Sequence, residues 1–188
     1  MVPPESARLD RVIVLIGDLL ERPPLPGLAV AIAERIAQRG ATVQAVGVLS
    51  GDAEGDVRML ALAAAGVGHA AVLRSPAAAL EPADLELALR YLPDAGALVL
   101  VGAPGLAAIT AAAASFGGVP LVIITDAEPA ADALPDDALV LGAPVDDPDG
   151  AFAGLVAELA VRLEAGATPA SAWADTLRTL VIEGRRAR

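Results

Sequence analysis

Residues 40–74, GATVQAVGVLSGDAEGDVRMLALAAAGVGHAAVLR, decide the fold of this chain. They predict a buried strand over residues 42–49, a turn at Ser50-Gly51-Asp52 and a helix over residues 53–65. After Gly66-Val67-Gly68 a second strand is expected over residues 69–73. The turn places an acidic side chain and free backbone N–H groups at the carboxyl end of a strand, where open α/β sheets bind ligands.

The same alternation continues on both sides of this unit. Residues 11–16, RVIVLI, form a β-branched run typical of a strand that is buried on both faces. Further strands are predicted over residues 97–101, 121–125 and 138–141, and further helices over residues 28–39, 82–92, 105–115, 150–165 and 169–183. Alternating strands and helices with short connections predict a three-layer α/β/α sandwich on a mostly parallel, Rossmann-like sheet.

The length of 188 residues fits one domain. Residues 1–10 are expected to be a flexible lead, because Pro3-Pro4 blocks regular structure and the segment is polar. Residues 11–184 are expected to form a single α/β domain, and residues 185–188 a basic tail.

Composition and charge exclude several classes of function. The formal net charge of −11 disfavours nucleic acid and anionic membrane surfaces as partners. No apolar run reaches the roughly 18 residues of a transmembrane helix, and the first residues do not resemble a signal peptide, so a cytoplasmic location is expected. The chain has no cysteine, and a single histidine, His69, is a poor metal site, so no metal site is predicted.

Three predicted strands end near an aspartate: Asp18, Asp52 and Asp126. In a parallel sheet these positions lie on one edge, so the three carboxylates could converge on a crevice that holds a cation or a polyol. Aspartate is also a common turn and helix-capping residue, which explains the same pattern without a ligand. Both interpretations remain open at this point.

A second acidic segment, Asp146-Asp147-Pro148-Asp149-Gly150, precedes the helix predicted over residues 150–165. The N–H groups at the start of that helix could bind an anion, whereas the carboxylates would repel a phosphate. An acidic cap that interacts with the helix dipole accounts for the same residues.

The spacing Gly47-x-x-Ser50-x-Asp52-x-x-Gly55, followed by Gly66-Val67, resembles a signature of the ribokinase-like (PfkB) carbohydrate kinases. Residues 145–180 resemble the segment of that family that contains its GAGD motif. The resemblance implies a sugar or nucleoside ligand, with Asp18, Glu21, Gly51 and Asp52 at the substrate. It further implies an anion site at Gly150 and Ala151, Asp149 as catalytic base, and ATP and Mg²⁺ as cofactors if kinase activity survives.

The chain also departs from the family pattern. Arg22 stands where the family has a sugar-binding aspartate, and only residues 23–27 remain where lid strands are expected. The chain has no asparagine, so the family's magnesium motif is absent, and GAGD is reduced to Pro148-Asp149-Gly150-Ala151. Phosphoryl transfer depends on the positioning and electrostatic stabilisation of the transferring phosphoryl group. The departures affect the motifs that would provide both.

The expected protein is therefore a lidless relative that has lost efficient phosphotransfer and acts as a small-molecule-binding or oligomeric module. One alternative is an active ATP-dependent sugar or nucleoside kinase of reduced size, and another is a protein that acts only through an interface. Loss of the lid should expose a sheet edge or a helix face, so a homodimer is expected.

Overall fold

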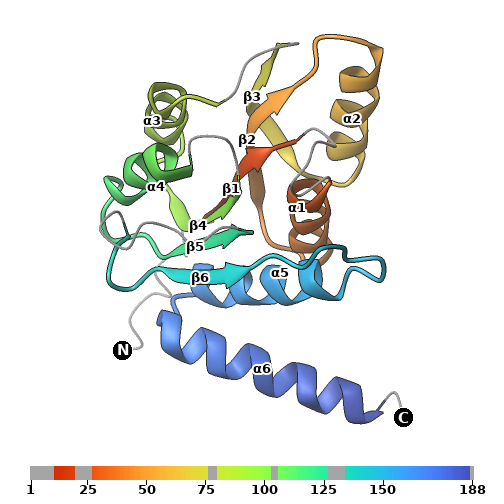
Figure 1. Ribbon diagram of the computed structural model, residues 1–188, viewed down its shortest axis with the longest axis vertical. Coiled ribbons are helices and arrows are strands. Elements are labelled where there is room, and N and C mark those ends of the chain that lie inside the picture. The colour runs from red at the N-terminus through yellow and green to blue at the C-terminus, as the bar shows by residue number, and fades with distance from the viewer. Residues whose placement is uncertain (1–10, 20–26, 76–79, 103–105, 127–133, 187–188) are drawn as a thin grey trace, which may run out of the picture.

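The computed structural model describes residues 11–19, 27–75, 80–102, 106–126 and 134–186, with the backbone alone described for residues 106, 107, 111 and 181–186 (Figure 1). Six strands are present in these ranges: β1 (Val12–Asp18), β2 (Val43–Leu49), β3 (Gly68–Arg74), β4 (Ala95–Val101), β5 (Leu121–Thr125) and β6 (Leu139–Gly142). The helices are α1 (Leu28–Gln38), α2 (Ala53–Ala64), α3 (Pro82–Arg90), α4 (Leu106–Ala114), α5 (Ala151–Glu164) and α6 (Pro169–Arg186).

All six strands are parallel and form one sheet with the order β3-β2-β1-β4-β5-β6. Each strand from β1 to β4 is followed by a helix, so the crossovers place helices on both faces of the sheet. The predicted α/β class and the Rossmann-like parallel sheet are confirmed.

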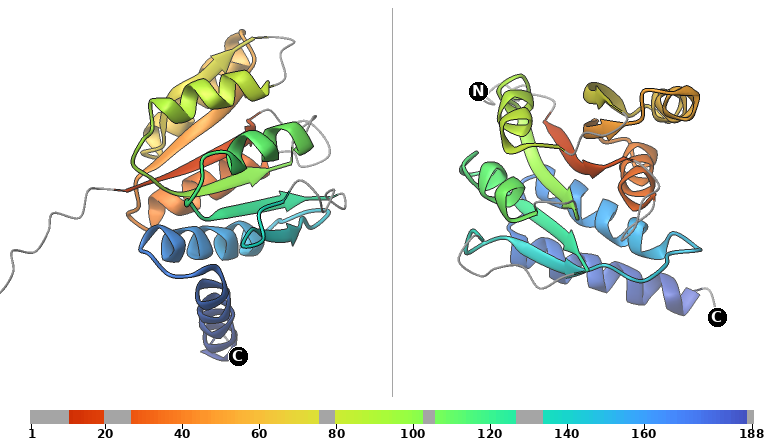
Figure 2. Two further views of the ribbon diagram at one scale, coloured as in Figure 1. Left: turned by 90° about the vertical axis from the view of Figure 1, so that its left-hand side faces the viewer. Right: turned by 45° about the horizontal axis from the view of Figure 1, so that its top comes forward.

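The alternation of side chains in β1 shows how the two faces are filled. Ile13 and Leu15 belong to a core shared with α1, α2 and α5, whereas Val14 and Ile16 belong to a core shared with α3 and α4. All four side chains are fully buried, as expected for a strand that is covered on both faces. Figure 2 shows the resulting layers, with α6 outside α5.

The predicted elements are present with small changes at their ends. Strand β1 continues through Gly17 and Asp18, which pair with Gly47 and Val48 of β2, although Gly-Asp is typical of a turn. Helix α1 ends where predicted, because Gly40 follows it with a φ of 80° that favours glycine. Helix α6 extends through Arg186 and so includes the first two residues of the predicted basic tail.

The predicted flexible lead, residues 1–10, lies outside the described residues. Within the described ranges, no helix is both long enough and apolar enough to cross a membrane.

Candidate ligand site at the carboxyl edge of the sheet

The strand order reverses between β1 and β4. The chain proceeds outward from β1 to β3 on one side of this point and from β4 to β6 on the other. In open α/β sheets, ligands bind beside the carboxyl ends of the strands at such a switch point. Asp18, the last residue of β1, lies at this point, and Asp126 follows β5 on the same edge.

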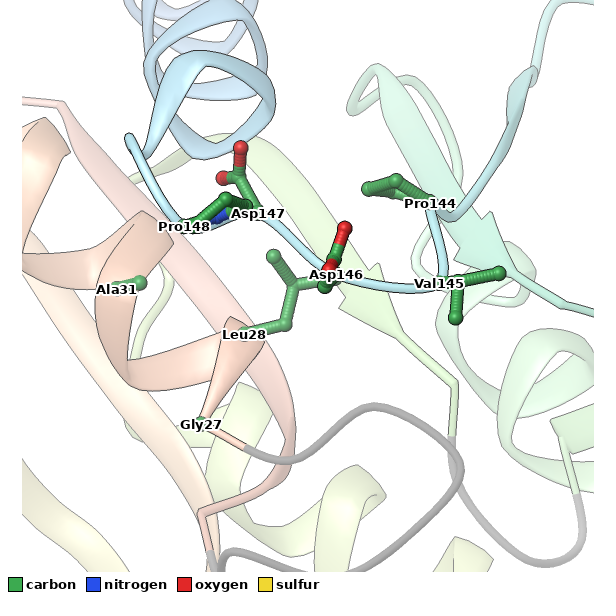
Figure 3. A pocket seen from close by; sticks show the side chains of 8 residues that line it. All are labelled: Gly27, Leu28, Ala31, Pro144, Val145, Asp146, Asp147 and Pro148. Carbon is green, nitrogen blue, oxygen red and sulfur yellow. The ribbon is translucent and has the colours of Figure 1, made fainter.

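A pocket of about 330 Å³ lies at this edge, between the start of α1 and the loop that joins β6 to α5 (Figure 3). Most of its lining is apolar, and its polar side chains are two carboxylates. The described lining residues are Gly27, Leu28, Ala31, Pro144, Val145, Asp146, Asp147 and Pro148. No cationic side chain is among them, so the described lining favours a neutral or cationic molecule over an anion.

The start of α5 borders this pocket, and a carboxylate occupies its N–H groups. The Phe152 N–H donates to Oδ1 of Asp147 at 2.9 Å, and the Ala153 N–H donates to Oδ2 at 2.8 Å. Figure 3 shows the Asp147 carboxylate turned toward α5. A bound anion would use the same N–H groups, so Asp147 takes the place of an anion at this helix terminus.

The predicted anion-binding residues Gly150 and Ala151 also have internal partners. The Gly150 N–H donates to the Asp147 carbonyl oxygen at 3.0 Å. The Ala151 N–H donates to Oδ1 of Asp149 at 3.2 Å. Asp149, the predicted base, therefore lies in the loop before α5 and caps this helix, and the neighbouring Pro148 lines the pocket instead.

Arg35 of α1 lies beside the same helix terminus. Its Nη2 atom is 2.7 Å from the position that a Cβ atom at Gly150 would occupy, so the guanidinium group packs directly on this glycine. Gly150 has a φ of 68°, which turns the loop back and leaves room for the arginine. The sequence analysis considered an acidic cap on this helix, and Asp147 and Asp149 form one. It did not identify Arg35, whose position depends on the packing of α1 against the start of α5.

The turn after β2 contains two further predicted site residues, Gly51 and Asp52. The Ser50 hydroxyl donates to Oδ1 of Asp52 at 2.7 Å, and the Gly55 N–H donates to the same oxygen at 3.1 Å. The Ser50 hydroxyl and then the Gly55 N–H lower the pKa of Asp52, because both stabilise the ionised carboxylate. Asp52 is thus the N-cap of α2, while Gly51 is exposed in the turn.

Gly47, the first residue of the spacing that resembles the PfkB signature, has a steric role. A Cβ atom there would lie 2.2 Å from the carbonyl oxygen of Gly17 on the adjacent strand β1. Glycine is therefore required where β2 passes close to the end of β1. This part of the signature reports a packing requirement of the fold.

The remaining predicted residues do not form a metal centre. Asp18 is half-buried and Asp126 is exposed, while Glu21 lies outside the described residues. Among the residues that the structure describes, no group of three or more Asp, Glu or His side chains could hold a metal ion. The three-aspartate crevice considered from the sequence therefore has no counterpart as a metal site in this part of the chain.

No protein-family model and no curated protein matches the sequence. Among solved structures, the aminoimidazole riboside kinase from Salmonella enterica, complexed with aminoimidazole riboside and an ATP analogue, is similar with a TM-score of 0.57. The two chains are 15% identical, and the match covers 88% of this chain and 89% of that one. A putative ribokinase II from E. coli in complex with ATP and Mg²⁺ is similar with a TM-score of 0.50 and 16% identity, over 90% of this chain and 70% of that one.

This chain has a ribokinase-like fold. The resemblance proposed from the central glycine spacing is confirmed at the level of the fold. All six described strands belong to the one parallel sheet, so the described residues contain no separate strands that could form a lid.

The described residues at the carboxyl edge of the sheet do not fit ATP-Mg²⁺. The N–H groups of Gly150, Ala151, Phe152 and Ala153 already donate to acceptors of this chain. The pocket lining contributes carboxylates that would repel phosphate groups.

Proposed function

We propose that this chain is a ribokinase-like domain that binds a neutral sugar or nucleoside at the carboxyl edge of its sheet and does not transfer phosphoryl groups efficiently. The observation that supports this most directly is the double hydrogen bond from the first turn of α5 to Asp147.

The hydrogen bonds between Asp147 and the first turn of α5 are the reason why we propose a loss of phosphotransfer. Phosphoryl transfer needs donors that are already placed to stabilise the charge of the transferring group. At α5 those donors point to Asp147, whose own negative charge also opposes an incoming phosphate. An incoming phosphate would have to displace this carboxylate from both N–H groups before it could bind there.

The ligand class follows from the pocket. Leu28, Ala31 and Val145 give it apolar walls, and Asp146 adds a carboxylate that can accept hydrogen bonds from hydroxyl groups. Its volume of about 330 Å³ is at the lower end for a small-molecule pocket. A pentose, a hexose or part of a nucleoside matches this size and chemistry.

Thermal-shift and calorimetric titrations with ribose, fructose and adenosine test binding. We expect a saturable shift with at least one of them, and loss of that shift in Ala31→Trp, which fills the pocket from α1. Ala61→Trp is the matched control, because Ala61 is exposed on α2. If none of the three compounds stabilises the protein, the binding role is wrong.

Release of ADP from ATP-Mg²⁺ in the presence of each compound tests the catalytic part. We expect no turnover above background. Turnover that is lost in Asp149→Asn would instead support a reduced ATP-dependent sugar or nucleoside kinase with Asp149 as base and Asp18 and Asp52 near the substrate. Absence of both binding and turnover would favour a purely structural or interaction role.

We further propose that the protein is cytoplasmic and forms a homodimer. The sheet is open, with β3 and β6 as its edge strands in the described residues, and a sheet edge is a common site of association, which supports the second statement.

A further inference from the structure

The two carboxylates of the pocket beside the start of α1 differ in how their charge is compensated. Asp147 accepts hydrogen bonds from the N–H groups of Phe152 and Ala153, at the positive end of the α5 dipole. Asp146 also lines the pocket, but the described part of the chain gives it neither a hydrogen bond nor an ion pair. The pocket therefore contains one carboxylate that is available to a ligand.

Apolar groups surround Asp146 in the pocket wall. Leu28 belongs to α1, and Pro144 and Val145 belong to the loop before α5. Figure 3 shows the Asp147 carboxylate turned toward α5, whereas the Asp146 side chain lies between Leu28 and Val145. Asp146 is exposed, so a ligand can reach its carboxylate from solvent.

The arginine beside this loop is directed elsewhere. The guanidinium group of Arg35 packs on Gly150, and its Nη1 atom donates to Oε1 of Gln38 at 3.4 Å. Arg35 is not among the described residues that line the pocket. A positive charge for Asp146 must therefore come from the ligand, as far as the described lining is concerned.

We propose that this pocket prefers ligands that carry a protonated amine, and that Asp146 determines this preference. The inference rests on the proposed function, because it concerns the same pocket, and it names amino sugars and amino-substituted nucleosides as the preferred members of the ligand class. Neutral sugars and nucleosides bind through their hydroxyl groups. A protonated amine adds a charge-assisted hydrogen bond to the carboxylate, which is stronger than a bond from a hydroxyl group.

A metal ion matches the pocket less well than an amine does. Ca²⁺ and Mg²⁺ require about six oxygen ligands. Among the described residues, no group of three or more Asp, Glu or His side chains could hold a metal ion, and Asp147 is already bound to α5. An organic amine needs few acceptors, and its carbon skeleton can pack on the apolar walls formed by Leu28 and Ala31.

The charge of the whole chain requires a matched control. A formal charge of −11 attracts every cation, so tighter binding of an amine does not by itself identify Asp146. Asp146→Asn removes one negative charge inside the pocket. Asp137→Asn removes one at an exposed residue that precedes β6, at the opposite, amino edge of the sheet. The two variants have the same formal charge and differ in where it is changed.

Calorimetric titrations with matched pairs of compounds test the preference. The pairs are glucose with glucosamine, and adenosine with 3′-amino-3′-deoxyadenosine, at about pH 6, which is below the usual pKa of such amines. We expect the amine to bind about two- to fivefold more tightly than its neutral partner, the range of an exposed ion pair. Asp146→Asn should bring this ratio to about one, and Asp137→Asn should leave it as in wild type.

Three further measurements link the ratio to this pocket. N-acetylglucosamine keeps the nitrogen without the charge and should lack the gain of glucosamine. Added sodium chloride should reduce the ratio, because it screens the ion pair, and should have little effect on glucose. Ala31→Trp fills the pocket from α1 and should abolish binding of both members of a pair.

The outcomes separate this inference from the proposed function. Equal affinities within both pairs, or an amine preference that persists in Asp146→Asn with a wild-type circular dichroism spectrum, would overturn the inference and leave the proposed binding of neutral ligands intact. If neither member of either pair binds, the binding function itself is wrong, and the inference is wrong with it.

Discussion

A Cβ atom at Gly55 would lie 1.9 Å from the carbonyl oxygen of Ser50, because the first turn of α2 packs directly against the turn that follows β2. Helix propensity favours alanine over glycine by about 1 kcal/mol. The steric contact opposes this gain, since the oxygen belongs to the backbone and cannot rotate away. We expect Gly55→Ala to lower the free energy of unfolding by about 1–3 kcal/mol, the usual range for overpacking.

Urea denaturation measures this effect, and Gly117→Ala is the control. No atom lies within 4 Å of the position that a Cβ atom at Gly117 would occupy. Its substitution should change the free energy of unfolding by less than about 0.5 kcal/mol. Equal effects of the two substitutions would contradict the steric explanation of this glycine.

The cap formed by Asp52 predicts a dependence of stability on pH. Its pKa is lowered by the Ser50 hydroxyl and then by the Gly55 N–H. Because the pKa of Asp52 is lower in the folded state, its ionised carboxylate stabilises the protein at pH values above the pKa of the unfolded chain, about 3.9. This contribution is lost as the pH falls through the lowered pKa of the folded state. The difference in melting temperature between wild type and Asp52→Ala should therefore be largest near neutral pH and should shrink in acid.

Asp52→Asn separates the charge from the cap. An asparagine side chain can accept the Gly55 hydrogen bond without titrating. Melting curves at several pH values should show that this variant is closer to wild type in acid than at neutral pH. A constant difference between wild type and Asp52→Ala at all pH values would mean that the lowered pKa has no effect on stability.

Much of the fold could be predicted from local sequence, because burial on both faces leaves a clear pattern. The run Val12-Ile13-Val14-Leu15-Ile16 has no polar residue and forms a central strand. The glycine spacing identified the fold for a steric reason, since a Cβ atom at Gly47 or at Gly55 would lie closer to a backbone oxygen than van der Waals contact allows. Such requirements belong to the scaffold and persist whatever chemistry the site performs.

The candidate site was less predictable, because its contacts depend on the geometry of one loop and on long-range packing. Gly150 adopts a positive φ, so the chain turns back and Asp147, four residues before the helix, reaches the N–H groups of Phe152 and Ala153. Simple capping rules look at the residue immediately before a helix. The position of Arg35 over Gly150 joins residues 115 apart in the sequence, and no local pattern reports it.

Arg39 predicts a second test of the contact between α1 and α5. Its Nη2 donates to the Gly154 carbonyl oxygen at 3.0 Å, its Nη1 to the Arg35 carbonyl oxygen at 3.0 Å, and its Nε to Oε2 of Glu158 at 3.3 Å. A lysine has one nitrogen and cannot make three bonds in this geometry. Arg39→Lys should lower the free energy of unfolding by about 0.5–1.5 kcal/mol.

The matched control is Arg90→Lys, at an exposed position near the end of α3. It conserves the charge in the same way and should leave urea denaturation unchanged within about 0.5 kcal/mol. Similar losses in both variants would mean that the forked contact of Arg39 adds no measurable stability.

Removal of the Asp147 carboxylate should uncover an anion site. Asp147→Ala frees the N–H groups of Phe152 and Ala153 beside the Arg35 guanidinium, so an anion could replace the lost carboxylate. We expect a loss of about 1–3 kcal/mol in the free energy of unfolding without added anion. Inorganic phosphate should then raise the melting temperature of Asp147→Ala in a concentration-dependent manner, and that of wild type much less.

Two variants show whether this response arises at the start of α5. Asp146→Ala removes a neighbouring exposed carboxylate from the same pocket and should respond to phosphate as wild type does. Asp147→Ala/Arg35→Ala keeps the freed N–H groups but loses the adjacent cation, so its phosphate response should be weaker than that of Asp147→Ala. If Asp147→Ala unfolds at the same temperature with and without phosphate, the carboxylate is only a helix cap, and this contact no longer supports the proposed loss of phosphotransfer.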